Sequence, residues 1–403
     1  MSETKKILLV MPHMIGGGAE RVGSLLMNAF DKRGYSTEVL LTSDRQGDVV
    51  RCDLGDETAL TLLPEELPAE SAGDKIKYGV LLKLWAQVFC NLFELLRRPV
   101  PADLAKASLF VQYRREIAWL RAKLKKEPET AVIAFLQPAI PIALLAARGL
   151  PNRVIFSERG NPERLMKKRY GRKFIEKYYL RADAAVFQTG AARDVYPAAV
   201  AAKGAVIPNP LKPGLPEPYA GPREDRVVTF CRISADKNLP LLVEAFARFR
   251  ETHPTYTLRI FGDAAGDDGK KTERELRDLI RARGLEHAAA MLPFRPDVHN
   301  EILRDAMYVN SSDTEGMSNA MLEAMAIGLP CVCTDCPVGG ARAAIRDGEN
   351  GLLTPVGDAD AMVRAMTRIA DDPELSGRLS AEAAKMSGRL STDAVAEQWV
   401  KLF

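Results

Sequence analysis

Residues 311–328 read SSDTEGMSNAMLEAMAIG, and this stretch places a turn of small residues immediately before an apolar helix. Ser318 or Asn319 can act as the N-cap, because a short polar side chain accepts a hydrogen bond from a free backbone N–H. Apolar residues then recur at helical spacing until Gly328 and Pro330 end the pattern. The stretch therefore predicts a buried helix that starts at this turn.

The predicted helix start has the chemistry of a phosphate-binding site. Its free N–H groups and the positive end of its dipole attract anions, and Gly316 carries no side chain that would keep a ligand away. Glu315 precedes the helix and Glu323 lies within it, with seven residues between them. Since carboxylates accept hydrogen bonds from hydroxyl groups, the two are expected to hold the hexose and the ribose of a nucleotide sugar. An ordinary capped helix with two surface glutamates would show the same spacing.

The segments around this helix alternate between strand and helix. Residues 227–249, VVTFCRISADKNLPLLVEAFARF, read as a strand, a loop and an amphipathic helix, with Arg232 and Lys237 in or beside the loop. Further strand-like runs follow at TLRIFGDA, AAAMLPFRPDV, AMYVNSS, PCVCTD and GLLTPV. This alternation is typical of a parallel sheet with helices on both faces, which binds ligands at the carboxyl ends of its strands. Arg232 and Lys237 are therefore expected to reach that edge and neutralise a diphosphate.

The N-terminal half starts in a similar way. The apolar run KKILLVMP at residues 5–12 predicts a buried first strand, and a helix follows the glycines at positions 16, 17 and 18. These glycines let the loop approach a ligand closely. A dinucleotide-binding fingerprint would need glycine where the chain has Arg21, which counts against a nicotinamide or flavin oxidoreductase.

Several motifs occur together in the order of a known family. The C-terminal ones are Arg232, Lys237 with Asn238, EGMSNAMLEAMAIGLP and DGENGLLTPVGD, and the N-terminal ones are PHMIGGGAERV, FSERGNP and IPNP. Over nearly its whole length the chain resembles a retaining glycosyltransferase of the large GT4 family, in the branch that builds bacterial surface polysaccharides such as lipopolysaccharide. The resemblance implies an α/β protein with the GT-B fold, in which two Rossmann-like doubly wound parallel-sheet domains face a central cleft.

The resemblance also implies a role for each motif residue. Glu315, Arg232 and Lys237 would be catalytic, because the two cations bind the donor diphosphate and stabilise the leaving group while Glu315 contacts the transferred sugar near its anomeric carbon. Glu323 would hold the ribose. The other implied donor-binding positions are Gly316, Met317, Ser318, Asn319, Gly262, Phe294, Arg295, Gly17 and Gly18.

The acceptor side departs from the family pattern. Many relatives have a histidine near the transferred sugar, at about the position of Ser157, Glu158 and Arg159. Glu158 and Arg159 are therefore acceptor-side candidates. His13 is a third, because it is the only histidine of the N-terminal half and lies in the first strand-to-helix loop. A solvated loop histidine is the simpler interpretation of His13.

The resemblance further implies that no metal ion or other cofactor is required, because the basic pair and the helix start stabilise the diphosphate. In agreement, the sequence has no acidic Asp-x-Asp cluster placed to bind a divalent cation. Cys331 and Cys333, close to Cys336, fall on a predicted buried strand with no histidine nearby, which disfavours a zinc site. The spacing of the six cysteines suits a reducing cytosol.

Length and turn residues predict two domains and a crossing helix. A chain of 403 residues is longer than a single core usually organises, and IPNP with the proline-rich run beyond it indicates a connection. We expect an N-terminal acceptor-binding Rossmann-like domain at 1–205 and a C-terminal donor-binding Rossmann-like domain at 206–385. Residues 386–403 are expected to form a helix that crosses back to the first domain.

Charge and hydropathy predict a cytoplasmic protein that contacts a membrane surface. The charged start does not read as a signal peptide, and no apolar run reaches the roughly 18 residues that a membrane span needs. Residues 159–181 contain nine Lys or Arg with aromatic residues between them. Such a charge run is usually a solvated face, but it also suits an anionic lipid surface or a lipid-linked pyrophosphate on the inner face of the cytoplasmic membrane. Residues 78–98 predict a helix that is buried in the core or, alternatively, interfacial. The nearly balanced net charge of +3 disfavours nucleic acid as a partner.

Together these features predict a retaining, metal-independent hexosyltransferase of glycosyltransferase group 1, an EC 2.4 type of enzyme. It would move a hexose from a nucleotide diphosphate sugar, expected to be a uridine diphosphate sugar, to a lipid-linked or growing glycan. Two other classes share the architecture. A nucleotide-sugar 2-epimerase would turn over the donor without an acceptor, and a non-catalytic sugar-nucleotide sensor would need no acceptor surface.

Overall fold

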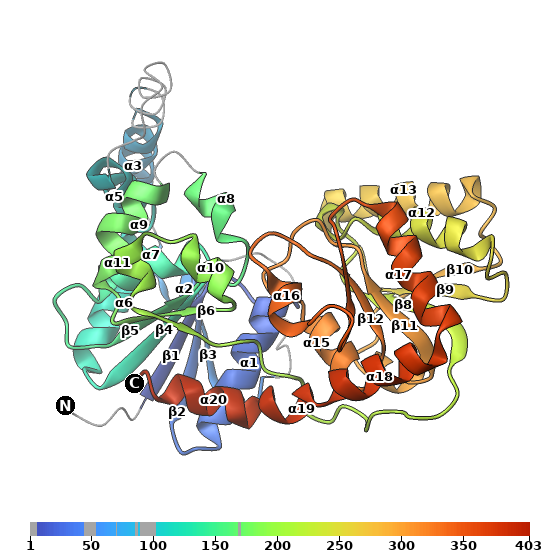
Figure 1. The fold of residues 1–403 in the computed structure, drawn as a ribbon. Coiled ribbons are helices and arrows are strands. Elements are labelled where there is room, and N and C mark those ends of the chain that lie inside the picture. Colours follow the sequence, from blue (N-terminus) through green and yellow to red (C-terminus); the bar gives the residue numbers. More distant parts are fainter. Residues whose placement is uncertain (1–5, 44–53, 70, 85–87, 89–101, 168–170) are drawn as a thin grey trace. The chain divides into compact units, whose positions relative to one another are not determined.

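The chain forms two compact units, each built on its own parallel sheet (Figure 1). The first unit consists of residues 1–210 and 395–403, and the second of residues 211–394. The computed structural model describes all residues except 1–5, 44–53, 70, 85–87, 89–101 and 168–170.

Within the described residues the sheet of the first unit has the strand order β3-β2-β1-β4-β5-β6-β7, and every neighbouring pair is parallel. Its strands are β1 (Lys6–Met11), β2 (Ser36–Leu41), β3 (Ala59–Leu62), β4 (Thr130–Phe135), β5 (Val154–Ser157), β6 (Ala184–Phe187) and β7 (Gly204–Val206). The accompanying helices are α1 (Gly18–Asp31), α2 (Leu63–Glu66), α3 (Ala72–Leu84), α5 (Ala102–Gln112), α6 (Arg114–Lys126), α7 (Ala139–Ala146), α8 (Pro162–Met166), α9 (Gly171–Tyr178), η2 (Tyr179–Arg181), α10 (Gly190–Asp194), α11 (Ala198–Ala201) and the C-terminal α20 (Thr392–Val400).

The sheet of the second unit has the order β10-β9-β8-β11-β12-β13 and is also parallel throughout. Its strands are β8 (Glu224–Phe230), β9 (Thr257–Phe261), β10 (Ala289–Leu292), β11 (Asp305–Asn310), β12 (Cys331–Thr334) and β13 (Leu352–Thr354). Its helices are η3 (Ala235–Lys237), α12 (Leu239–Arg250), α13 (Gly266–Ala282), α14 (Val298–Ile302), α15 (Asn319–Ala326), α16 (Gly340–Ala344), α17 (Ala359–Asp371), α18 (Pro373–Ala384) and α19 (Met386–Arg389).

Both sheets bury side chains on both faces, which is why the central strand β1 (KILLVM) reads as an almost unbroken apolar run. Successive side chains of a strand point to opposite faces. Leu8 and Leu9 of β1 accordingly belong to two different cores of the first unit. Val227 and Val228 of β8 are divided in the same way between the two cores of the second unit. The predicted pair of Rossmann-like, doubly wound parallel sheets is confirmed.

The connection between the units falls after Pro210 rather than after residue 205. Ile207 is buried in the first unit's core, and the Asn209 side chain accepts a hydrogen bond from Gln188 of the first unit at 2.9 Å. The backbone N–H of Leu211 already bonds to the second unit. The whole IPNP motif at residues 207–210 thus belongs to the first unit, where burial of its side chains holds it.

The C-terminal residues return to the first unit from Val395 onward, whereas residues 386–394 belong to the second. Trp399 of α20 is fully buried in the core beneath β1 and β4, with its ring centroid 5.9 Å from that of Phe135. The final ring, Phe403, packs edge-on against Phe30 at 5.4 Å. An apolar helix face at the very end of the chain therefore completes the core that the first strand begins.

The basic segment 159–181 buries those of its aromatic side chains that the structure describes. Burial of these rings in the first unit's core leaves charged residues of α9 outside, among them Arg172, Lys173 and Lys177. Residues 168–170 lie outside the described residues. The buried aromatic residues are Phe174, Tyr178 and Tyr179.

Most of the predicted helix at 78–98 also lies outside the described residues. The part that belongs to α3 leaves Val80 48% and Leu81 44% exposed, so the interpretation as a core helix is wrong for this part. None of the helices that the structure describes combines the length and apolar character needed to cross a membrane.

Substituting Trp399 by Ala should lower the free energy of unfolding of the first unit by about 3–5 kcal/mol, because the change removes a fully buried large side chain. Chemical denaturation of the purified protein measures this effect. Trp119→Ala is the matched control, since Trp119 is only partly buried at the edge of the core. Equal effects of the two substitutions would contradict the anchoring role of α20.

Candidate functional site

The candidate site lies where the second sheet changes its direction of winding. β8 pairs with β9 on one side and with β11 on the other. The loop after β8 leads to α12, which packs in one core, and the loop after β11 leads to α15, which packs in the other. Two loops that diverge at the carboxyl ends of adjacent strands leave a crevice between them, and such switch points are where α/β sheets bind ligands.

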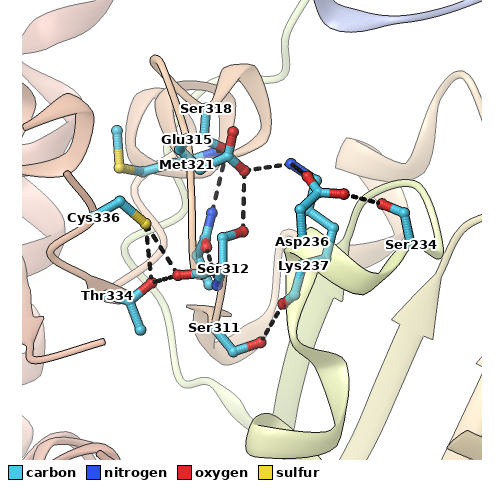
Figure 2. A network of polar contacts seen from close by, with 11 residues as sticks. Ser234, Asp236, Lys237, Ser311, Ser312, Glu315, Ser318, Met321, Thr334 and Cys336 are labelled. Atoms are coloured by element: carbon cyan, nitrogen blue, oxygen red, sulfur yellow. Dashed lines mark hydrogen bonds and ion pairs between the residues drawn. The ribbon is translucent and has the colours of Figure 1, made fainter. Parts of the chain in front are cut away.

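Hydrogen bonds join these two loops, and Figure 2 shows the one between Ser311 and Lys237. Ser311 Oγ donates to the backbone oxygen of Lys237 at 3.0 Å, and the backbone N–H of Asp313 donates to the Asp236 oxygen at 2.9 Å. The Asn238 side chain donates to Asp313 Oδ1 at 2.8 Å. These bonds could not be predicted from the sequence, because their partners lie more than seventy residues apart.

Lys237 and Glu315 meet across the joined loops, as expected of residues that share a site. Lys237 Nζ lies 2.5 Å from Glu315 Oε1, and the two side chains are only 14% and 17% exposed. Ser312 Oγ donates a second hydrogen bond to the same carboxylate oxygen at 3.0 Å. Burial lowers the pKa of Lys237, but the charge and hydrogen bond of Glu315 outweigh it and raise the pKa above its usual value. Lys237 is therefore a fixed cation at neutral pH.

Arg232 extends from the same loop but remains at the surface. Within the described part of the chain its side chain makes no hydrogen bond or ion pair, which leaves the guanidinium available to an anionic ligand. Burial raises the pKa of the nearby Asp236, but a hydrogen bond from Ser234 and the charges of Lys237 and Arg232 bring it below its usual value. Asp236 thus stays ionised beside the two cations.

The helix start is built as the sequence indicated. Ser318 is the N-cap, and its Oγ accepts a hydrogen bond from the backbone N–H of Met321 at 3.2 Å. Asn319 is the first helical residue, and Met317 is buried beneath the turn. The Gly316 carbonyl would lie 2.1 Å from a Cβ atom at Gly340. Glycine at position 340 therefore lets the α16 segment pack against the turn.

Glu323 is buried and contacts a residue that sequence reasoning missed. His299 Nε2 lies 2.8 Å from Glu323 Oε2, and the side chains are 5% and 4% exposed. His299 is on α14, after the loop that contains Phe294. In the sequence His299 stands in the mixed polar and apolar run DVHNEIL, and nothing around it points to Glu323, which lies 24 residues further on.

The remaining donor-side candidates fall around the ends of β9 and β10. A Cβ atom at Gly262 would lie 1.8 Å from the Cys231 carbonyl oxygen, so glycine is needed for the backbone after β9 to approach the loop after β8. Phe294 is 62% exposed, and its backbone N–H donates to Asp263 at 3.1 Å. Arg295 forms an ion pair with Glu301 at 2.7 Å.

In the first unit the loop after β1 brings His13 and Gly17 to the start of α1. Gly17 is the N-cap residue and Gly18 the first helical residue. A Cβ atom at Gly17 would lie 2.3 Å from Glu20 Oε2, so the glycine makes room for this buried carboxylate. His13 Nδ1 lies 3.1 Å from Glu20 Oε1. His13 is thus a partly exposed loop residue, with a side chain that is 24% exposed and a ring that lies against Glu20.

Arg159 is directed into the interior of the first unit rather than toward solvent. It donates to Ser157 Oγ at 3.1 Å and to the Asn209 side chain, and burial lowers its pKa to about 9. The neighbouring Glu158 is half-buried and accepts a weak hydrogen bond from Gln137 at 3.5 Å. Arg159 thus contributes no surface charge to the basic segment that it begins, whereas Glu158 keeps partial exposure.

Cys331 and Cys333 lie on β12 as predicted, and both are buried free thiols. Cys336 is buried as well, and its thiol donates to the Ser312 backbone oxygen at 3.0 Å. Burial raises the pKa of Cys336 to about 11, which keeps it protonated beside the site. In the described ranges no group of three or more His, Cys, Asp or Glu side chains is arranged to hold a metal ion.

Residues 219–386 match the family model described as glycosyl transferases group 1. This segment contains Lys237, Glu315 and Glu323. The chain is 33% identical over 200 residues to an exopolysaccharide phosphotransferase of Streptomyces coelicolor, which corresponds to 49% of this chain and 20% of that protein. It is 29% identical over 177 residues to a lipopolysaccharide core biosynthesis glycosyltransferase of Rhizobium meliloti, with 44% of this chain and 48% of that protein covered. The chain thus spans less than half the length of these two relatives.

A solved structure matches over almost the full length. HepE of Anabaena, crystallised in complex with UDP, has a TM-score of 0.70 and 19% sequence identity, and 98% of each chain is covered. At this identity the likeness shows the fold alone. The fold is the GT-B type that the sequence predicted, with two Rossmann-like units.

Proposed function

We propose that this chain is a retaining, metal-independent glycosyltransferase that transfers a hexose from a uridine diphosphate sugar to a lipid-linked or growing glycan of a bacterial surface polysaccharide. The observation that carries the proposal is the meeting of Lys237 and Glu315 beside the capped start of α15. This constellation joins a cation for a diphosphate, a carboxylate for sugar hydroxyls and free helix N–H groups at one switch point. It lies within the segment that matches glycosyl transferases group 1.

In the proposed reaction the donor diphosphate binds Lys237, Arg232 and the N–H groups at the start of α15. The bond between the anomeric carbon and the phosphate oxygen breaks, and the acceptor oxygen bonds to the same face of that carbon. The acceptor proton passes to the departing phosphate oxygen. The two cations stabilise the charge that develops on the diphosphate, and this electrostatic term is usually the largest contribution to catalysis.

Lys237 can bind a phosphate oxygen of the donor while it remains paired with Glu315. Glu315 faces the ammonium group and holds Lys237 in place. A phosphate oxygen can use another of the three hydrogens of the ammonium group. The Glu315 carboxylate has further lone pairs that are not used by Lys237. It can therefore accept hydrogen bonds from hydroxyl groups of the hexose.

A thermal-shift screen tests the donor and the absence of a metal requirement. A ligand that binds only the native protein raises the melting temperature. We expect uridine diphosphate and its sugar conjugates to do so in the presence of EDTA, with guanosine and adenosine diphosphates as comparisons. No response to any nucleotide would contradict the proposal. If the protein converts the donor when no acceptor is present, it is better described as a nucleotide-sugar 2-epimerase. If it binds the donor but converts it under no condition, it is better described as a non-catalytic sensor.

Glu315→Ala and Lys237→Ala should each reduce sugar transfer at least 10-fold, equivalent to about 1.4 kcal/mol or more of transition-state stabilisation. The measurement is kcat/KM with the donor identified by the screen. Lys385→Ala is the matched control, because it breaks an exposed ion pair with Glu382 in the same unit. Wild-type rates in both site variants would refute the assignment of the two residues.

The proposed acceptor is held at a membrane, and the surface of the first unit supports this part of the proposal. α5 packs against both α3 and α9. Exposed apolar side chains on α3 and α5 therefore lie near the exposed basic residues Arg172 and Lys173 of α9. This combination suits an anionic surface at the cytoplasmic face, where each basic group contributes on the order of 1 kcal/mol. The exposed apolar residues are Ile76, Val80, Leu81 and Phe110.

Reversing both α9 charges, in Arg172→Glu with Lys173→Glu, should weaken binding to phosphatidylglycerol vesicles roughly 10-fold or more, because two attractive groups of about 1 kcal/mol each become repulsive. Vesicle co-sedimentation measures the effect, and neutral phosphatidylcholine vesicles give the baseline. The control makes the same charge change on α13 of the second unit, in Lys270→Glu with Lys271→Glu. Equal binding by the two double variants would exclude α9 as the contact.

A further inference from the structure

The contact between His299 and Glu323 links three parts of the second unit. His299 lies on α14, shortly after the exposed ring of Phe294, and Glu323 lies within α15. The His299 ring also packs edge-on against Phe230, with 5.5 Å between the ring centroids. Phe230 ends β8, immediately before the loop that carries Arg232. The imidazole is therefore held between the end of β8 and the helix whose start forms the candidate site.

The chemistry of the contact fixes its direction. An ionised carboxylate can only accept hydrogen bonds, so Nε2 of His299 carries the hydrogen and donates to Glu323 Oε2 over 2.8 Å. Both side chains are at least nine-tenths buried, and the ring is held by Phe230, so the donor has little freedom to move. A carboxylate offers about four lone-pair positions, which lets the same group accept a hydroxyl hydrogen while it remains bonded to the imidazole.

We propose that His299 is a positioning residue for the donor ribose: it orients the Glu323 carboxylate so that this group accepts a hydrogen bond from a ribose hydroxyl. The inference rests on the proposed function and adds to it a residue outside the motifs that indicated that function. It connects the segment next to the expected base with the carboxylate expected at the ribose. Recognition of the nucleoside then depends on one buried hydrogen bond between α14 and α15.

A purely structural His–Glu pair would have a different signature from a positioning pair. Loss of a structural pair would weaken the protein and would affect all nucleotides alike. Loss of a positioning pair would affect a ribonucleotide more than an analogue that lacks the hydroxyl in question. The difference between UDP and its deoxy analogues therefore isolates the proposed role from general effects on folding.

The experiment compares the dissociation constants of UDP, 2′-deoxy-UDP and 3′-deoxy-UDP by titration calorimetry. For the wild-type protein we expect one deoxy analogue to bind at least 10-fold more weakly than UDP. The amide of Asn in His299→Asn is too short to reach the position of Nε2. This variant should bind UDP about 10-fold more weakly than the wild-type protein does, and it should bind the discriminated deoxy analogue with the wild-type dissociation constant. His299→Gln places an amide nitrogen near the position of Nε2 and should restore most of the discrimination. In sugar transfer, His299→Asn should raise the KM for the donor more than it lowers kcat.

His253→Gln is the matched control, because His253 Nε2 also contacts a carboxylate, Asp371 Oδ1, at 2.9 Å but lies away from the site. This variant should keep wild-type discrimination. Equal weakening of all three nucleotides in both His299 variants would overturn the proposal in favour of a structural pair. The proposal would also be overturned if the wild-type protein bound UDP and both deoxy analogues equally well. Wild-type protein that binds no uridine, guanosine or adenosine diphosphate would instead refute the proposed function, and the inference with it.

Discussion

The candidate site depends on the hydrogen bonds that join the loop after β8 to the loop after β11. Ser311 and Asp313 bond to the backbone around Lys237, and Asn238 returns a side-chain bond to Asp313. Adjacent parallel strands bring these loops to one edge of the sheet, but parallel pairing alone does not set their separation. The cross-bonds do so, and they hold Lys237 and Glu315 at contact distance. Preorganisation of this kind lowers the cost of ordering charged groups during a reaction.

Burial determines which charges of the second unit are available for chemistry. Lys237 and Glu315 are mostly buried, and each would be costly to bury without the other. Arg232 is exposed and can approach a ligand from solvent. The cysteines beside the site are kept protonated by burial, so they act as small apolar and hydrogen-bonding groups rather than as nucleophiles. The site therefore combines a mostly buried, paired cation with an exposed one, and a diphosphate is a ligand that two such groups can bind.

In the first unit, buried side chains hold the C-terminal helix α20 and the end of β5 in place. Trp399 fills the core next to Phe135, and Arg159 ties the end of β5 to Asn209 near the connection. Arg159, which reads as part of a surface charge run, is buried, and His13 of the first loop lies against the buried Glu20. The basic surface that remains lies on α9, which packs against α5, and α5 in turn packs against α3. Both α3 and α5 leave apolar side chains exposed.

The sequence by itself determined the two doubly wound sheets, the capped start of α15 and the loops that carry Lys237 and Glu315. Apolar runs, glycines and N-cap residues act over a few positions, so their consequences can be read locally. It could not determine that Glu323 would meet His299, that Asn238 would bond to Asp313, or that the aromatic rings of α9 would be buried. These contacts join residues that are distant along the chain or depend on which face of a helix packs inward. Only the tertiary structure decides them, because a side chain's partner is set by the packing of whole elements and not by its neighbours in the sequence.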